Sequence, residues 1–184
     1  MVLITDEYRK QQEELHKNPN YGEASVAYAP LVAEIVGQFG IEQMVDYGAG
    51  KGRLAVALQE PLVSRLGVCN YDPAVPKWSE APPPCEFVAC VDVLEHIEPD
   101  CLDDVIDDLN RCSENLLLTT IHTGPAKKVL PDGRNAHLIQ EDESWWLPKF
   151  WARGFRIRGF GVAMVKNVDH GGIWVLWQSG TTQS

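Results

Sequence analysis

A glycine-rich segment, VDYGAGKGRLAVAL at residues 45–58, carries the clearest chemical signal in the sequence. It places Asp46 ahead of three alternating glycines, which are Gly48, Gly50 and Gly52. A short apolar run precedes the glycines and a helix-like run follows them. Because glycine has no side chain, a ligand can approach the backbone of such a turn closely. The segment predicts a binding loop for a phosphate, a dinucleotide or another cofactor, with an unliganded tight turn as the alternative.

The residues around Lys51 separate these possibilities. A phosphate-binding loop of the GxxxxGK type requires Ser or Thr after its lysine, but Lys51 is followed by Gly52 and Arg53. The dinucleotide pattern GxGxxG requires glycine or alanine at position 53, and Arg53 stands there. The pattern present is DxGxGxG, which fits neither loop.

Three histidines lie after predicted strands or in a late loop, and they are candidates for acid–base chemistry: His96, His122 and His137. Histidine titrates near neutral pH, so it can take a proton from a reacting group. Each also has a structural alternative, because a histidine can cap a helix, pack beneath one or hydrogen-bond within a loop. The other two histidines, His16 and His170, are expected at the surface.

The clusters of charged residues predict neither a metal site nor one particular class of ligand. Four acidic residues lie close together in the sequence: Glu86, Asp92, Glu95 and Glu98. Some lie on a predicted strand and others on a loop, and they face different directions, so no metal site is predicted from them. A basic segment, KKVLPDGR at 127–134, either holds an anionic acceptor or forms a solvated loop.

Apolar periodicity and breaking residues divide the chain into alternating helices and strands. Helices are expected at 5–17, 24–39, 53–59, 99–111 and 141–153, and strands at 41–47, 66–71, 86–91, 116–121, 155–165 and 172–178. Pro30 either kinks the second helix or lies in its first turn. The alternation is typical of an α/β fold with helices on both faces of a mostly parallel sheet. The last two strands, joined by 167–171, predict an antiparallel hairpin.

Length and composition fit one soluble domain over 1–184, with a helical extension at 1–23 and a flexible tail at 179–184. The 184 residues are 45% apolar and 23% charged, and their net charge of −10 disfavours nucleic acid as a partner. No apolar run reaches the ~20 residues that cross a membrane. Five cysteines without CxxC spacing and a charged N-terminal segment predict reduced thiols and a cytoplasmic location. The oligomeric state is not predicted.

The DxGxGxG loop resembles motif I of the class I S-adenosylmethionine-dependent methyltransferases, and later segments extend the resemblance over residues 24–178. These segments are NYDPAV, EFVACVDVLEHIEPD and NAHLIQEDESWWLPKFWARGFRI. The resemblance implies a Rossmann-like fold with S-adenosylmethionine as its cofactor. It assigns to the cofactor Asp46, Gly48, Gly50 and Gly52 in the loop, Asp72 and Pro73 near the ribose, and Asp92, Val93 and Leu94 at the methionine end.

The resemblance also implies methyl transfer to an unidentified acceptor, and a small molecule is favoured. His137 matches a late histidine of the family that often lies on the substrate side, and His96 and His122 follow strands that end near the cofactor. Tyr21 and Tyr28 are candidates for a lid. The combination of segments is most similar to small phage and bacterial methyltransferases.

One region departs from the family pattern. A helix and a further strand usually separate the ribose-binding acid from the strand before the VLEH segment, but here only the proline-rich residues 73–85 are available. The sheet is therefore expected to be one strand short, and Trp78 is a candidate to stack on the adenine. This shortening keeps a second function open, in which the protein binds S-adenosylmethionine or a partner without transferring a methyl group.

Overall fold

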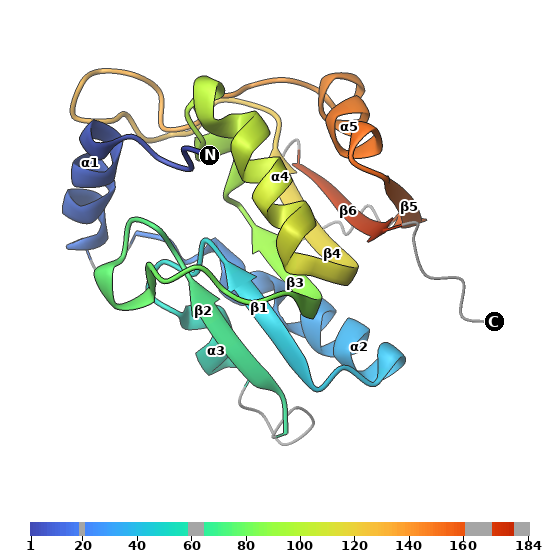
Figure 1. Ribbon diagram of the computed structural model, residues 1–184. Helices are drawn as coiled ribbons and strands as arrows, with labels where there is room; N and C mark the ends of the chain where they lie inside the picture. The colour runs from blue at the N-terminus through green and yellow to red at the C-terminus, as the bar shows by residue number, and fades with distance from the viewer. Residues whose placement is uncertain (19–20, 59–64, 161–170, 179–184) are drawn as a thin grey trace.

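A mixed sheet forms the centre of the computed structural model, which describes residues 1–18, 21–58, 65–160 and 171–178 (Figure 1). In these residues the sheet has six strands in the order β2–β1–β3–β4–β6–β5. Strands β1 to β4 run parallel, whereas β6 pairs antiparallel with both β4 and β5. The expected α/β fold, with a mostly parallel sheet and an antiparallel pair of final strands, is confirmed.

The strands are β1 Gln43–Tyr47, β2 Gly67–Tyr71, β3 Cys85–Val91, β4 Ser113–His122, β5 Phe155–Phe160 and β6 Gly171–Gln178. β1 lies between β2 and β3, so Val45 pairs with Cys69 on one side and with Val88 on the other. The expected strand at 155–165 is present as far as residue 160. Its remainder and residues 167–170 of the connection, His170 among them, lie outside the described residues.

The helices are α1 Asp6–His16, α2 Ala29–Phe39, α3 Arg53–Ala57, α4 Leu102–Cys112 and α5 Glu143–Ala152. Short 3₁₀ turns accompany them: η1 Ala24–Tyr28, η3 Pro76–Trp78, η4 Leu94–His96 and η5 Pro99–Cys101. Pro30 lies in the first turn of α2, so the helix expected over 24–39 is a 3₁₀ turn followed by an α-helix. A proline is well placed there because the first N–H groups of a helix have no partner within it.

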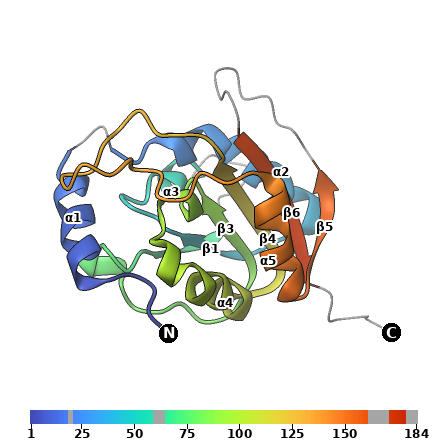
Figure 2. The same ribbon diagram turned by 90° about the horizontal axis from the view of Figure 1, so that it is seen from above.

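Two hydrophobic cores cover opposite faces of the sheet. Successive side chains of a strand point to opposite faces. Val45 and Val88 therefore pack with α4 and α5, whereas Met44 and Phe87 pack with α2 and α3. Figure 2 shows these two helix pairs on either side of the sheet.

Residues 72–84 join β2 to β3 without a strand, and η3 is the only regular element in this fully described link. The expectation of a sheet one strand short is therefore confirmed, and β2 is its edge strand. Arg111 of α4 donates a hydrogen bond of 3.0 Å to the carbonyl of Pro82, which ties the proline-rich link to the helix layer.

Segments from distant parts of the chain cover the carboxyl edge of the parallel strands. Tyr8 of α1 packs against Leu130 and Ala136 in the long loop after β4. Figures 1 and 2 both show α1 and this loop side by side at that edge of the molecule. Within the described ranges, no helix combines the length and the apolar character that crossing a membrane requires.

Candidate functional site

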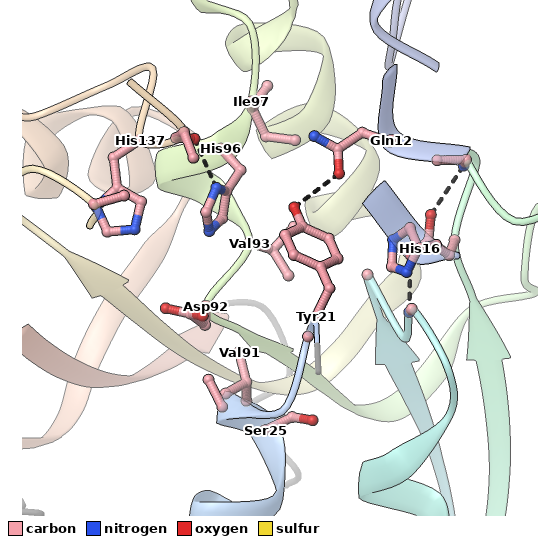
Figure 3. Close-up of a pocket in the computed structure, with 18 of the residues that line it drawn as sticks. Gln12, His16, Tyr21, Ser25, Val91, Asp92, Val93, His96, Ile97 and His137 are labelled. Carbon is pink, nitrogen blue, oxygen red and sulfur yellow. Dashed lines mark hydrogen bonds between the residues drawn. The ribbon is translucent and has the colours of Figure 1, made fainter. Parts of the chain in front are cut away.

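A cavity of about 470 Å³ opens at the carboxyl edge of the sheet (Figure 3). Its floor includes the residues that directly follow β1, β2 and β3, which are Gly48, Asp72 and Asp92. Residues of α1 and the segment 21–25 cover it, and residues 125–128 of the loop after β4 close a further side. Ligands of open α/β sheets bind at this edge, and the volume suits a small organic ligand.

The glycine loop is packed so closely that larger residues would not fit. Gly48 has a φ of 78°, and a Cβ placed on it would lie 2.4 Å from the side chain of Val93. A Cβ on Gly52 would lie 2.4 Å from the indole of Trp78. Trp78 therefore contacts the loop from outside and does not line the cavity. The loop requires these glycines for its own packing.

The carboxylate of Asp72 forms hydrogen bonds that hold the glycine loop and the segment after β2. One of its carboxylate oxygens accepts a hydrogen bond of 2.8 Å from the N–H of Gly50, and the other accepts one of 2.9 Å from the N–H of Ala74. Each carboxylate oxygen has two lone pairs, so each can accept a second hydrogen bond from a ligand hydroxyl. Asp72 can therefore bind a vicinal diol while it holds the loop in place.

Asp46 lies behind the loop, where 3% of its surface is exposed. Within the described residues, no group donates a hydrogen bond to its Oδ2. Burial raises the pKa of Asp46 to about 7, and the nearby carboxylate of Asp72 adds to the rise. A buried carboxyl without a positive partner favours its neutral form.

His16 forms part of the cavity wall, so the expectation that it is a surface residue is wrong. Its Cε1 lies 3.0 Å from the point where Gly50 would carry a Cβ, and its ring meets that of Tyr21 edge-on with 5.1 Å between centroids. Burial lowers the pKa of His16, and the charge of Asp72 opposes that effect. The sequence of α1 reads as a polar surface helix and carries no signal of this contact.

Tyr21, one of the two lid candidates, does reach into the cavity. Its hydroxyl donates a hydrogen bond of 3.0 Å to the amide oxygen of Gln12 in α1, and the ammonium of Lys128 lies 4.6 Å from its ring centroid. In Figure 3 the Tyr21 ring stands between His16 and His96. The Tyr21 side chain thus lies between His16, which contacts the glycine loop, and the histidine His96.

His96, His122 and His137 meet at one end of the cavity. The ring centroids of His96 and His122 each lie 4.8 Å from that of His137. Nδ1 of His96 donates a 2.7 Å hydrogen bond to the carbonyl of Ala136, and Nδ1 of His137 donates one of 2.7 Å to the carbonyl of Gly124. Because a carbonyl only accepts, both rings carry a proton on Nδ1, and in the neutral ring Nε2 keeps its lone pair. Burial lowers the pKa of His96, which favours that neutral form.

Two carboxyl groups adjoin these histidines. Asp92 follows β3 with a φ of 58°, a left-handed conformation that Asp tolerates better than most residues. Glu95 is fully buried, and one oxygen accepts a hydrogen bond of 2.6 Å from the N–H of His122. Burial raises the pKa of Glu95, and the charge of Asp92 raises it further. Asp92, Glu95, His96 and His137 each place one ligand atom within 4.8 Å of the others, a compact set that the sequence analysis did not foresee.

The cavity brings together most of the residues that the sequence assigned to a site. On its wall lie Gly48, Gly50, Asp72, Pro73, Asp92, Val93, His96, His122 and His137. The remaining assigned residues lie behind the wall: Asp46 and Leu94 are buried, and Gly52 packs against Trp78. Leu94 belongs to the core on the α4 face of the sheet.

The basic residues of segment 127–134 lie in two different places, some at the cavity and one outside it. Lys127 and Lys128 line the cavity, whereas Arg134 lies outside it and forms a salt bridge of 2.7 Å with Asp132. Tyr28, the second lid candidate, does not line the cavity. Positive charge is therefore available at the cavity in an otherwise acidic protein.

No family model matches the sequence, and no curated protein matches it significantly. Solved structures do match. The 1,6-didemethyltoxoflavin-N1-methyltransferase of Burkholderia thailandensis, with bound 1,6-didemethyltoxoflavin and S-adenosylhomocysteine, has a TM-score of 0.66 at 14% identity, over 98% of this chain and 92% of that chain. The chain has the methyltransferase fold.

Two further methyltransferase structures show how widely this fold is shared. Magnesium protoporphyrin IX methyltransferase (ChlM) from Synechocystis PCC 6803, with bound S-adenosylhomocysteine, has a TM-score of 0.58 at 14% identity, over 95% of both chains. The small RNA methyltransferase HEN1 has a TM-score of 0.58 at 12% identity, over 83% of this chain but only 25% of that chain. The methyltransferase fold of this chain therefore occurs in proteins named for small-molecule and for RNA substrates.

Proposed function

We propose that the protein transfers a methyl group from S-adenosylmethionine to an acceptor in the cavity. The observation that carries this proposal is the pairing of Gly50 with Asp72: a glycine loop and a carboxylate able to bind a diol meet at the carboxyl edge of the sheet. The similarity in fold to methyltransferases with bound S-adenosylhomocysteine supports the same cofactor.

In this proposal the cofactor spans the floor of the cavity. The loop of Gly48 and Gly50 holds the amino-acid part, and Asp72 with Pro73 holds the ribose. Asp92 and Val93 flank the methionine end, while Asp46, Gly52 and Leu94 act from behind the wall by shaping these segments. Because the glycines of the loop carry no side chain, the cofactor can approach the backbone there closely.

The acceptor is proposed to bind at the histidine end and to be a small molecule. A nucleophilic atom of the acceptor forms a bond to the methyl carbon, the carbon–sulfur bond breaks, and S-adenosylhomocysteine leaves. Where the acceptor atom carries a proton, His96, His122 or His137 is placed to receive it. Lys127 and Lys128 favour an anionic acceptor. The net charge of −10 argues against RNA, which is the competing acceptor class.

Titration calorimetry with S-adenosylmethionine and S-adenosylhomocysteine tests the proposal directly. We expect both to bind, because the sulfonium and the thioether share the ribose and amino-acid contacts. Absence of binding at millimolar ligand would overturn the proposed cofactor. Binding without methyl incorporation into any component of a metabolite extract would favour a protein that keeps the fold without methyl transfer.

A pair of glycine variants makes the test specific to the loop. Gly50→Ala adds a Cβ within 3.0 Å of His16 at a φ of 53°, and it should abolish cofactor binding. Gly40→Ala is the matched control, since Gly40 has a φ of 65° with open space around it and lies at the end of α2. Equal affinities in the two variants would show that the cofactor does not bind at this loop.

A further inference from the structure

The four residues Asp92, Glu95, His96 and His137, here called the Asp92 cluster, bring two carboxylates and two imidazoles together. Their ligand atoms all lie within 4.8 Å of one another, close enough to contact a single ion. Three of the four residues line the cavity, and Glu95 lies behind them. Carboxylate and imidazole groups together form the donor set that divalent ions of the first transition series prefer.

The two histidines present the atoms that a metal ion requires. Nδ1 of His96 is bonded to the carbonyl of Ala136 and Nδ1 of His137 to that of Gly124, both at 2.7 Å. Nε2 of each ring is thus left with a lone pair. Metal-binding histidines in proteins are oriented in this way, because a backbone carbonyl accepts from the second ring nitrogen and fixes the tautomer.

Glu95 supplies an independent observation. Its side chain is fully buried, and among the described residues no group donates a hydrogen bond to its Oε2. No Lys or Arg of the described chain forms a salt bridge with Glu95 or with Asp92. Two adjacent carboxylates without a positive partner are costly to bury while both are ionised. A bound cation removes that cost.

Hydrogen bonds from neighbouring elements hold the cluster in position. The N–H of His122 donates to Glu95 at 2.6 Å, and the N–H of Asp92 donates to the side-chain oxygen of Thr120 at 3.0 Å. The N–H of Ile139 donates to the main-chain carbonyl of Glu95 at 3.0 Å, which fastens the loop that carries His137. The end of β4 and this loop therefore preorganise the ligand atoms, as a selective ion site requires.

We propose that the Asp92 cluster binds one divalent ion of the first transition series, such as Mn²⁺, Co²⁺ or Zn²⁺. Glu95 is the ligand behind the ion, and Asp92, His96 and His137 surround it from the cavity side. Coordination positions toward the cavity stay open for a ligand oxygen. A site of this donor set prefers these ions to Mg²⁺, which favours oxygen ligands alone.

The role of the ion rests on the proposed methyl transfer. Figure 3 places His96 and His137 across Tyr21 from His16, which packs against the glycine loop. An ion at the Asp92 cluster would hold an acceptor oxygen at the end of the cavity opposite that loop and lower the pKa of its hydroxyl. With Nε2 of His96 and of His137 bound to the ion, His122 is the histidine left to receive the hydroxyl proton. The inferred class of acceptor is therefore a hydroxyl compound able to bind the ion.

Metal titration without cofactor tests the ion site. Protein stripped by a chelator is titrated with Mn²⁺, followed by electron paramagnetic resonance, and with Co²⁺, followed by visible absorption. We expect one equivalent of either ion to bind, and a higher melting temperature in its presence because the ion binds only the folded state. The proposal is overturned if neither ion binds stoichiometrically at millimolar concentration, or if Mg²⁺ binds as tightly as Mn²⁺.

Three variants locate the ion. His137→Gln and Glu95→Gln should each weaken Mn²⁺ binding by more than about tenfold. Asp92→Asn should do the same, and it guards against a folding defect because Asn tolerates the left-handed backbone as well as Asp does. Asp100→Asn, an exposed acid in η5, is the control for ions held by surface charge. Loss of affinity equal to that of the control, in variants that melt cooperatively, would place the ion elsewhere.

Failure of the ion site and failure of the proposed function give different results. If Mn²⁺ binds and S-adenosylmethionine does not, the ion site stands and the cofactor proposal falls. If S-adenosylmethionine binds and neither Mn²⁺ nor Co²⁺ does, the Asp92 cluster is no metal site, while methyl transfer stays supported. Methyl incorporation that a chelator abolishes and Mn²⁺ restores would support the role of the ion in the reaction.

Discussion

The phenol of Tyr8 donates a hydrogen bond of 2.8 Å to the main-chain carbonyl of His96, and this bond joins α1 to the segment after β3. Thr5 adds a second link nearby, because its hydroxyl donates to the carboxylate of Glu98 at 2.8 Å. Through these contacts the N-terminal helix becomes one wall of the cavity.

Removing the phenol hydroxyl should loosen this wall. Tyr8→Phe keeps the buried ring, which is 3% exposed, but leaves the His96 carbonyl without that donor. We expect the free energy of unfolding to fall by ~1 kcal/mol in urea titrations. Lys17→Ala at the exposed end of the same helix should leave the unfolding curve unchanged, because solvent-exposed ion pairs contribute little. Equal curves for wild type and Tyr8→Phe would contradict the importance of this bond.

The contact between Gly48 and Val93 predicts a rescue by a second substitution. Gly48→Ala places a Cβ 2.4 Å from Val93 and adds left-handed strain of ~1–2 kcal/mol. We expect a clear loss of melting temperature, part of which Val93→Ala in the same chain restores by removing the clash. Gly37→Ala, in open space on α2, should stabilise the protein instead, because alanine favours helix. A double variant no better than Gly48→Ala would contradict the steric explanation.

Asp46 predicts a pH dependence of stability with a defined sign. Its pKa is about 7 in the folded protein against 3.8 for an unperturbed group. Between these values the folded state holds the proton that the unfolded state has lost, so stability falls as pH rises from about 4 to 7. Relative to Asp46→Asn, the wild type should lose on the order of 2–4 kcal/mol over this range and then level off. Urea titrations of both proteins at several pH values measure this difference, and a flat or rising difference would be inconsistent with the raised pKa.

Asp72 predicts an effect on cofactor affinity that stability alone does not explain. Asp72→Asn keeps the shape of the side chain but loses the charge and one acceptor oxygen, so the ribose contact weakens. We expect about tenfold to hundredfold weaker binding of S-adenosylhomocysteine by calorimetry. Asp100→Asn should bind as the wild type does. Unchanged affinity in Asp72→Asn, with the protein folded, would remove Asp72 from the cofactor site.

The parts of the fold that the sequence predicts are those set by local patterns. The period of β1, the glycines after it and the proline-rich link after Asp72 all follow from neighbouring residues, so the sheet and its missing strand could be predicted. The end of α2 at Gly40 likewise follows from the residue itself.

The parts that the sequence does not predict depend on contacts between distant residues. His16 faces Gly50 only because α1 folds over the edge of the sheet, and nothing in the polar pattern of α1 marks that face. The Asp92 cluster needs His137 from a loop well beyond β4, so considering the acidic residues alone could not find it. The residues of one segment are enough to predict a strand. They are not enough to predict which two loops come into contact in the folded protein.

The position of α1 also sets an order of events in folding. Its hydrogen bonds reach partners 88 residues away at His96, 93 at Glu98 and 121 at Asp132. Contacts of such long sequence separation form late, because closing large loops costs entropy before it yields any interaction. During synthesis α1 cannot form these contacts until the loop after β4 has left the ribosome. No residue of α1 belongs to the two hydrophobic cores on the sheet, so we expect α1 to open locally while the sheet stays folded. Amide hydrogens of α1 should therefore exchange with solvent well before those of β1 and β3.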